Sequence, residues 1–185
     1  PLARGAGLPG LAAIPARFER EGMHFERPLL NVPGSVLREW LLAQRLPWIE
    51  DPSNADENYT RNRIRRQLLP ALAAAFPGFR ETFARSARHA AQAQALLDSI
   101  AADDLQAMGG TPVIAALQAL PRARRANLLR HWLRSTYQAA PSTAQLEELL
   151  DQIEACRTRG HRIRIKVADG FVQRADERLT YSRAI

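Results

Sequence analysis

The sequence predicts a mainly α-helical chain with a small β-hairpin or sheet at its C-terminal end. Apolar residues recur at intervals of three and four over long stretches, which is typical of amphipathic helices. After Ile163 the apolar residues alternate instead, which is typical of strands. The chain has 185 residues, 46% hydrophobic and 24% charged, which is an ordinary globular composition with room for one domain or two small ones.

The first part of the chain is rich in glycine and proline, so residues 1–33 can form only short elements. Extended segments are expected at 23–27 and 29–32. A helix is expected to open at Ser35 and to end before Pro47. Trp40 and Trp48 lie on apolar faces and are expected in a core, as is Trp132 farther along. We interpret this part as the trailing edge of a domain that lies mostly upstream.

A turn and two helices are predicted next. Asp51, Ser53 and Asn54 belong to a stretch of turn-forming residues, and we expect them to hold and orient that turn. Thr60 is expected to cap a helix over 61–76, which Pro77 ends. A helix over 79–108 follows, long enough at 1.5 Å per residue to form a rod of about 45 Å.

Residues 109–112, Gly-Gly-Thr-Pro, are the best candidate for a domain boundary. Beyond it, helices are expected from Pro121 and from Ser142, which forms a capping box with Gln145. The pair Asp169–Gly170 predicts a hairpin turn, and 179–182 a third strand. The expected division is 1–77, a linker helix over 78–110, and a small α+β domain over 111–185.

Charge indicates the class of partner. Lys and Arg number 26 against 19 Asp and Glu, giving a net charge of +7, and all but one of the 26 are arginines. Such an excess favours nucleic acid as a partner, although the preference for arginine over lysine can also reflect the base composition of a genome. No apolar run is long enough to span a membrane. A single cysteine, Cys156, excludes an internal disulfide, and the histidines share no metal-ligand spacing. No metal site is therefore expected, and the cytoplasm is the expected location.

The segment 50–70 contains the residues best suited to chemistry. On a helical wheel, Arg61 and Arg65 point the same way as Leu68 and Leu72. An arginine aimed inward needs an anion, because an unpaired buried charge is costly. The anion is either an acidic residue of the preceding turn or a bound phosphate, and spacing alone leaves both open.

A basic stripe is predicted on the helix that begins at Pro121. Arg124, Arg130 and Arg134 fall opposite its apolar face, at the spacing of a phosphate-tracking surface or of an ordinary solvated one. Arg162 and Arg164 belong to a second basic cluster that precedes the predicted hairpin. These five arginines are the candidate RNA contacts.

The string IEDPSNADENYTRNRIRRQLLPAL, over 49–72, resembles the end of the catalytic domain of the tRNA(Ile)-lysidine synthetase family. LARGAGLPGLAAI, over 2–14, resembles that family's glycine-flanked arginine segment, and RRANLLRHWLRSTYQAAPSTAQLEELL, over 124–150, its small substrate-binding domain. The resemblance covers nearly the whole chain. It implies the trailing edge of an α/β PP-loop domain, a long linker helix and a small α+β substrate-binding domain.

The resemblance also implies an activity. Family enzymes use ATP, with Mg²⁺, to adenylate the 2-carbonyl of the wobble cytidine in tRNA(Ile) with a CAU anticodon, and free lysine then displaces AMP to give lysidine. It implies that Arg61 and Arg65 stabilise the developing charge, that Asn62 orients substrate, and that Arg4 faces the same site. The implied partners are the tRNA, lysine and ATP, with self-association as a homodimer left open.

The family's ATP-binding loop, S-G-G-x-D-S, and its H-H-x-x-D-x-x-E-T segment do not occur in these 185 residues. We therefore expect the chain to be part of a longer enzyme and inactive by itself. The alternatives are a basic helical module that binds nucleic acid without catalysis, and a structural domain whose long helix pairs with another copy. A related tRNA thiolase is disfavoured, because such enzymes commonly use catalytic cysteines and Cys156 lies on an apolar helix face.

Overall fold

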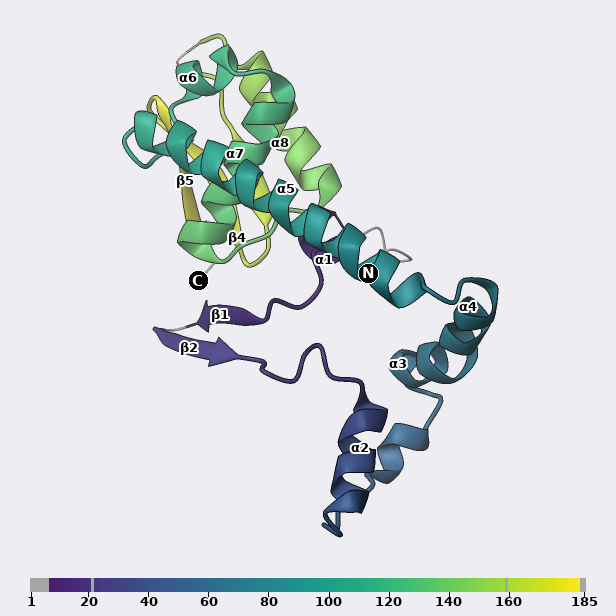
Figure 1. Cartoon of the computed structure of the whole chain (residues 1–185). Helices are drawn as coiled ribbons and strands as arrows, with labels where there is room; N and C mark the ends of the chain where they lie inside the picture. Colours follow the sequence, from purple (N-terminus) through teal and green to yellow (C-terminus); the bar gives the residue numbers. More distant parts are fainter. Residues whose placement is uncertain (1–6, 21, 159, 184–185) are drawn as a thin grey trace. The chain divides into compact units, whose positions relative to one another are not determined.

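The structure, a computed structural model, describes residues 7–20, 22–158 and 160–183 (Figure 1). The chain divides into two compact units, unit 1 (Pro1–Ala91) and unit 2 (Gln92–Ile185). The division falls inside the long helix α5 (Phe79–Ala107), which confirms the helix expected over 79–108. The expected partition into 1–77, 78–110 and 111–185 stays a prediction.

Unit 1 consists of short helices and one two-stranded antiparallel sheet. Before α5 its elements are α1 (Leu8–Leu11), β1 (Arg17–Arg20), β2 (Met23–Glu26), α2 (Gly34–Ala43), the 3-10 turn η2 (Pro52–Ala55), α3 (Thr60–Arg63), the π-helical turn η3 (Ile64–Leu68) and α4 (Leu69–Ala75). β1 and β2 place Phe18 opposite Phe25, with stacked rings 4.9 Å apart. The extended segment expected over 29–32 is wrong, because backbone hydrogen bonds from Leu30 to Arg27 and from Val32 to Leu29 close turns there.

The helix predicted over 61–76 exists but is not uniformly α-helical. Leu69 donates its backbone N–H to the Ile64 carbonyl, five residues back, which is the π-helical pattern. Pro70 follows at once and has no N–H to continue the α-helical ladder, which accounts for the change of pattern here. The predicted cap is wrong: Thr60 is the first helical residue, and Tyr59 holds the cap position without a side-chain bond.

Unit 1 has little interior. Among its described residues only Asn62 and Phe79 are buried. The tryptophans Trp40 and Trp48 are 57% and 39% exposed, so their expected core positions are wrong. Helical spacing identifies an apolar face, but it cannot show whether anything packs on that face.

Unit 2 contains the hydrophobic core. Besides the end of α5 its elements are α6 (Ile114–Ala119), α7 (Arg122–Tyr137), α8 (Thr143–Ala155), β3 (Arg164–Val167), β4 (Gly170–Ala175) and β5 (Arg178–Arg183). The expected capping box is confirmed, because the Ser142 hydroxyl accepts from the Gln145 backbone while the Gln145 side chain accepts from the Ser142 backbone. The hairpin at Asp169–Gly170 and the third strand are confirmed as the antiparallel sheet β3-β4-β5.

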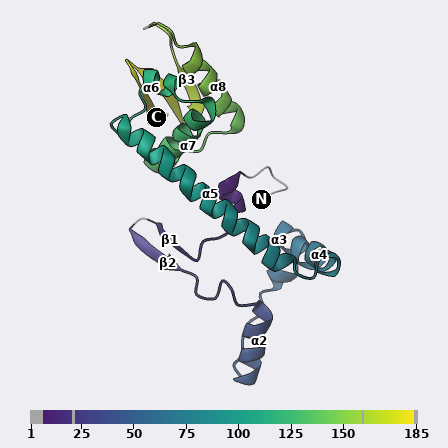
Figure 2. The ribbon, with the colours of Figure 1, turned by 45° about the horizontal axis from the view of Figure 1, so that its top comes forward.

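The core of unit 2 lies between the helices and one face of this sheet (Figure 2). Trp132 of α7 is 1% exposed, as expected, and its ring contacts Tyr137 edge-on at 5.5 Å. Inward-facing strand residues such as Val167, Val172 and Leu179 are fully buried. Cys156 is buried at the end of α8 and accepts a hydrogen bond from Arg174, as suits a small core residue. In the described part of the chain, none of the helices has the length and apolar character needed to cross a membrane.

Candidate functional site

A side-chain amide fastens the turn before α3 to the helix. Asn62 is 1% exposed, and its Nδ2 donates to the carbonyls of Ser53 and Asp56 at 2.9 and 2.7 Å. Its Oδ1 is buried without a hydrogen-bond partner among the described residues. Because its amide is enclosed by the turn, Asn62 is placed to hold the turn, and its expected role in orienting a substrate stays a prediction.

The turn itself is built by the residues that the sequence singled out. The Asp51 carboxylate accepts the Ser53 backbone N–H at 2.8 Å, which caps η2, and Asn54 lies within η2. The Ser53 backbone N–H, then its side chain, hold the pKa of Asp51 below its ordinary value, and the charge of Arg61 adds a smaller effect in the same direction. The turn is therefore ordered by local bonds, as expected of Asx-type turns.

The structure corrects the orientation inferred for the arginines of α3 and η3. Arg61, Arg65 and Leu68 are all exposed, so the arginines do not point into packed apolar side chains. Arg66, two positions from Leu68 on the same helix, is the arginine that bonds the turn, through the Ala55 carbonyl at 3.0 Å and Glu57 at 3.5 Å. The inference failed because unit 1 buries almost no apolar surface there.

Arg61 and Arg65 are consequently exposed cations without a salt bridge in the described part of the chain, although the charge of Arg61 acts on Asp51 from a distance. The Arg61 guanidinium lies 4.9 Å from the centroid of the Tyr59 ring, a cation–π contact that orients it without neutralising it. The acidic candidates bond elsewhere: Glu50 pairs with Arg38 at 3.2 Å, and Asp56 accepts from the Asn58 backbone. Two such guanidinium groups on α3 and η3, directly after a held turn, suit an anionic ligand such as a phosphate. Arg4, the fourth residue predicted for this site, lies outside the described residues.

The basic stripe of α7 is largely engaged with α5. Arg124 forms a two-pronged pair with Asp104, both contacts at 2.8 Å, and this hydrogen bond raises the pKa of Arg124 above its ordinary value. Arg134 pairs with Asp98. Both side chains remain about half exposed, at 51% and 44%. Arg130 is exposed and has no carboxylate partner within the described ranges.

Sequence reasoning missed Arg125, the buried arginine of α7. It is 5% exposed, and its guanidinium donates to the carbonyls at the C-terminal end of α6. A signal existed: residues 125, 128, 129 and 132 share the spacing of one helix face, so Arg125 lies on the apolar side. Its role is structural, because it satisfies carbonyls that a helix end leaves unbonded.

The second basic cluster lies beside the sheet. Arg162 and Arg164 are exposed and line a hollow of about 520 Å³ together with His161 and Gln173. The Arg164 guanidinium stacks on Phe171, 4.1 Å from the ring centroid. Neither arginine has a carboxylate partner in the part of the chain that the structure describes.

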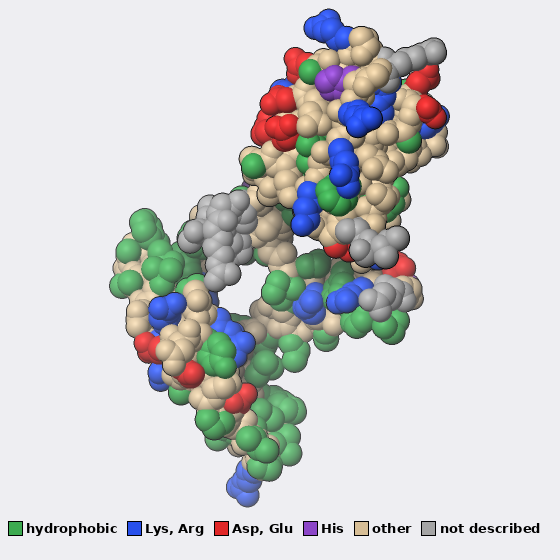
Figure 3. All heavy atoms as spheres, turned by 180° about the vertical axis from the view of Figure 1, so that it is seen from behind, with side chains coloured by type: hydrophobic (Ala, Val, Ile, Leu, Met, Phe, Trp, Pro, Cys, Tyr) green, Lys and Arg blue, Asp and Glu red, His purple; other side chains and the backbone are tan. Residues whose placement is uncertain are grey.

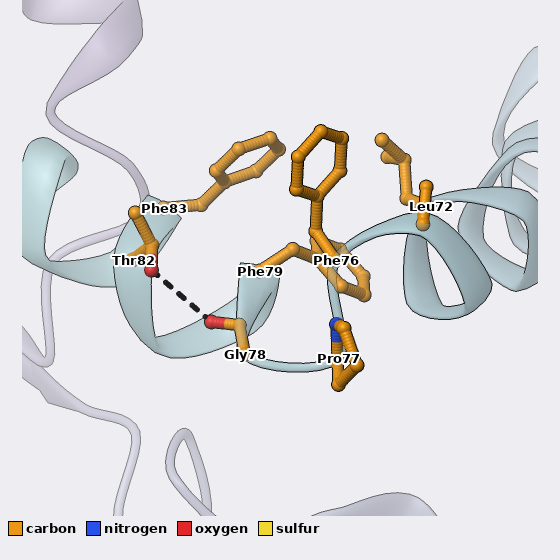
Figure 4. A pocket seen from close by; sticks show the side chains of 8 residues that line it. Leu72, Phe76, Pro77, Gly78, Phe79, Thr82 and Phe83 are labelled. Atoms are coloured by element: carbon orange, nitrogen blue, oxygen red, sulfur yellow. Dashed lines mark hydrogen bonds between the residues drawn. The ribbon is translucent and has the colours of Figure 1, made fainter.

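An apolar hollow of about 510 Å³ lies at the corner between α4 and α5 (Figure 4). Leu72, Phe76 and Phe83 line it, and its one hydroxyl, on Thr82, donates to the Gly78 carbonyl at 3.2 Å. It offers no acid, base or cation, so it is not a candidate for chemistry. The described residues also contain no group of three or more His, Cys, Asp or Glu side chains that could hold a metal ion.

Two family models match the chain: a PP-loop domain over residues 1–72 and a TilS substrate binding domain over residues 113–180. The chain is 63% identical over 183 residues to the tRNA(Ile)-lysidine synthase of Polaromonas naphthalenivorans, which covers 99% of this chain and 56% of that protein. It is 44% identical over 170 residues to the tRNA(Ile)-lysidine synthase of Burkholderia pseudomallei, a match that covers 89% of this chain and 35% of the relative. It is 40% identical over 159 residues to the tRNA(Ile)-lysidine synthase of Escherichia coli O157:H7, a match that covers 84% of this chain and 37% of the relative. The chain thus spans between about a third and just over half of these relatives.

Proposed function

Because this chain belongs to the family of tRNA(Ile)-lysidine synthases, we propose that it serves the ATP-dependent ligation of lysine to the wobble cytidine of tRNA(Ile) with a CAU anticodon. In this reaction the cytidine 2-carbonyl oxygen is adenylated by ATP with loss of pyrophosphate. The lysine ε-amine then bonds to that carbon as AMP departs, leaving lysidine. The proposal rests on the matches over both units together with the exposed arginines described above.

Unit 1 supplies the charge for this chemistry. Arg61 and Arg65 would contact the α-phosphate and the cytidine oxygen, where negative charge develops, and fixed guanidinium groups stabilise such charge. Asn62 would act as a positioning residue, since it fastens the preceding turn to α3, the helix that carries Arg61. The described residues contain no cluster of three or more His, Cys, Asp or Glu side chains to hold Mg²⁺, so the residue roles proposed here do not involve that ion.

Unit 2 would hold the tRNA through its phosphates. Arg130, Arg162 and Arg164 are exposed cations without carboxylate partners among the described residues, so they can bond phosphate without first breaking an ion pair. Arg124 and Arg134 would contribute more weakly, because Asp104 and Asp98 compete for them. We propose the cytoplasm as the location of the protein. We also propose that the chain self-associates as a homodimer, which light scattering of the chain across a concentration series would test.

The experiment that tests substrate recognition is fluorescence anisotropy of the chain with tRNA(Ile) carrying the CAU anticodon and with initiator tRNA(Met), over a salt series. Tighter binding to tRNA(Ile) that survives moderate salt is expected. Arg130→Gln combined with Arg162→Gln should weaken binding and reduce the salt slope by about 0.7–0.9 for each phosphate that is no longer neutralised. Arg85→Gln, which removes an exposed charge from α5, is the matched control. Equal, steeply salt-dependent binding to both tRNAs would favour a nucleic-acid module without recognition of this substrate.

The role of Arg61 and Arg65 is tested by NMR of the arginine Nε–Hε groups during titration with ATP. Selective shifts at these two residues, with Arg63 unmoved, are expected. Uniform shifts at all exposed arginines would refute a specific site.

We further propose that the 185-residue chain, which lacks the S-G-G-x-D-S sequence, makes no lysidine from ATP, lysine and tRNA(Ile). Detection of lysidine by mass spectrometry of the digested tRNA would contradict this.

A further inference from the structure

The three-stranded sheet of unit 2 has one buried and one open face. The register pairs Ile165 with Val172 and Val172 with Tyr181, and all three belong to the core. Side chains alternate along a strand, so their neighbours belong to the opposite face. Two rows of side chains cross the strands on that open face. One row is Lys166, Phe171 and Ser182, and the other is Arg164, Gln173 and Thr180.

The open face is uniformly basic or neutral. β3, β4 and β5 contain five Lys or Arg residues and no Asp or Glu. Acidic residues occur only in the hairpin turns, such as Asp169, which pairs with Arg183 at 3.4 Å. Arg174 and Arg178 are tied to backbone carbonyls, so Arg164 and Lys166 are the cations that this face presents. Seen from behind, the surface of unit 2 as a whole exposes Asp and Glu side chains as well as Lys and Arg (Figure 3).

An aromatic ring lies in the middle of this charge. Phe171 is half-buried and contributes nothing to the core cluster, although it is large and apolar. Lys166 is its direct cross-strand partner, and Arg164 covers part of its ring at 4.1 Å. An aromatic ring and a guanidinium plane, both on a rigid sheet and flanked by cations, form the surface on which unpaired bases stack.

We propose that this face binds an unpaired segment of the RNA substrate, with one base stacked on the Phe171–Arg164 pair and Lys166 bonded to a neighbouring phosphate. The inference rests on the proposed function, which supplies RNA as the partner, and adds a stacking residue that the basic clusters do not include. The occupant is single-stranded because bases inside an A-form duplex are already stacked on each other and cannot lie on a flat protein surface. The absence of carboxylates on the strands complements the phosphate backbone.

The test compares two fluorescein-labelled probes, an eight-nucleotide single-stranded RNA and an eight-base-pair RNA duplex, binding to the full chain. Phe171→Leu keeps an apolar side chain in the sheet but removes the aromatic face. We expect it to weaken single-strand binding by at least about fivefold, the low end of the effect of losing one stacked base, and to leave duplex binding unchanged. Lys166→Gln should weaken single-strand binding and reduce its salt slope, because it removes a cation that bonds phosphate of the unpaired segment.

The chain offers a matched control. Phe18 of β1 also has an arginine over its ring, with Arg27 at 4.4 Å, but the β1-β2 sheet carries Glu19 and Glu26 as well. Phe18→Leu should therefore leave both affinities unchanged. Circular dichroism melting of each variant separates lost folding from lost binding.

The outcomes are distinguishable. If Phe171→Leu folds normally and binds the single strand as tightly as the unmodified chain, the stacking surface is refuted while RNA binding by the basic clusters stands. An equal loss for the two probes also refutes it, because stacking acts only on unpaired bases. If the unmodified chain binds neither probe nor tRNA(Ile), the proposed function fails together with this inference.

Discussion

Replacing the buried arginine of α7 tests the account of unit 2 most directly. Arg125 Nε donates to the Leu117 carbonyl at 2.8 Å, and its NH2 group donates to the carbonyls of Gln118 and Leu120 at 3.3 and 3.2 Å. Arg125→Met preserves the apolar stem but leaves the carbonyls of Gln118 and Leu120 without this donor, whereas Leu117 still accepts the Leu120 backbone N–H at 3.1 Å. Each acceptor left unpaired in the interior costs about 1–3 kcal/mol.

The expected loss in the free energy of unfolding is about 2 kcal/mol, the low end of that range for two acceptors, because removing a desolvated charge offsets part of the cost. For a unit of this size such a loss lowers Tm by about 8–16 °C. Arg125→Lys should recover only part of it, because an ammonium group cannot match the planar arrangement of donors.

The assay is urea unfolding of the full chain followed by tryptophan fluorescence. Trp132 is 1% exposed and lies in unit 2, whereas Trp40 and Trp48 already face solvent substantially, so the emission shift reports chiefly on unit 2. Arg130→Met is the matched control, since it removes an exposed arginine from the same helix and should change stability by less than about 0.5 kcal/mol. Equal effects of the substitutions at 125 and 130 would refute the structural role of the buried guanidinium.

Three further predictions concern the turn and the sheet. Asn62→Ala should free the turn that contains Ser53, lower the free energy of unfolding by about 1–3 kcal/mol and accelerate backbone hydrogen exchange over 53–58. Unchanged exchange would contradict the role of Asn62 in holding the turn. Gly170→Ala should disrupt the β3-β4-β5 sheet, because a Cβ there would lie 2.5 Å from the Ser182 backbone oxygen and 2.6 Å from the Tyr181 ring. A Tm equal to that of the unmodified chain would show that this close approach is absent. Tyr181 donates to Asp169 at 2.9 Å; burial and then this bond raise the pKa of Tyr181, while the same bond lowers the pKa of Asp169. The stabilisation of the folded state by neutral Tyr181 is therefore present below its unfolded pKa of about 10 and is lost as pH rises through its folded pKa. The stabilisation by ionised Asp169 is present above its unfolded pKa of about 4 and is lost as pH falls through its folded pKa. Tyr181→Phe should flatten both limbs of a Tm-against-pH profile, and an unaltered profile would disprove the linkage.

Local patterns in the sequence were sufficient to predict most elements of unit 2. The capping box at Ser142 and the hairpin at Asp169–Gly170 involve residues within three or four positions of each other, so their geometry follows from adjacent side chains. The long α5 follows from a periodicity sustained over many residues. The resemblance of 49–72 and 124–150 to a known family likewise depends on the order of residues alone.

The folded chain determined which charges are free. A helical wheel places Arg124 and Arg130 on one polar face, but Asp104, twenty residues before Arg124, neutralises one and leaves the other exposed. The direction of Arg61 and Arg65 depended on whether the apolar stripe beside them is buried, which periodicity cannot tell. Local elements and family membership could be predicted from the order of residues, because both depend on side chains that are close along the chain. The partners of each arginine could not, because ion pairs and burial join residues whose separation along the sequence carries no signal.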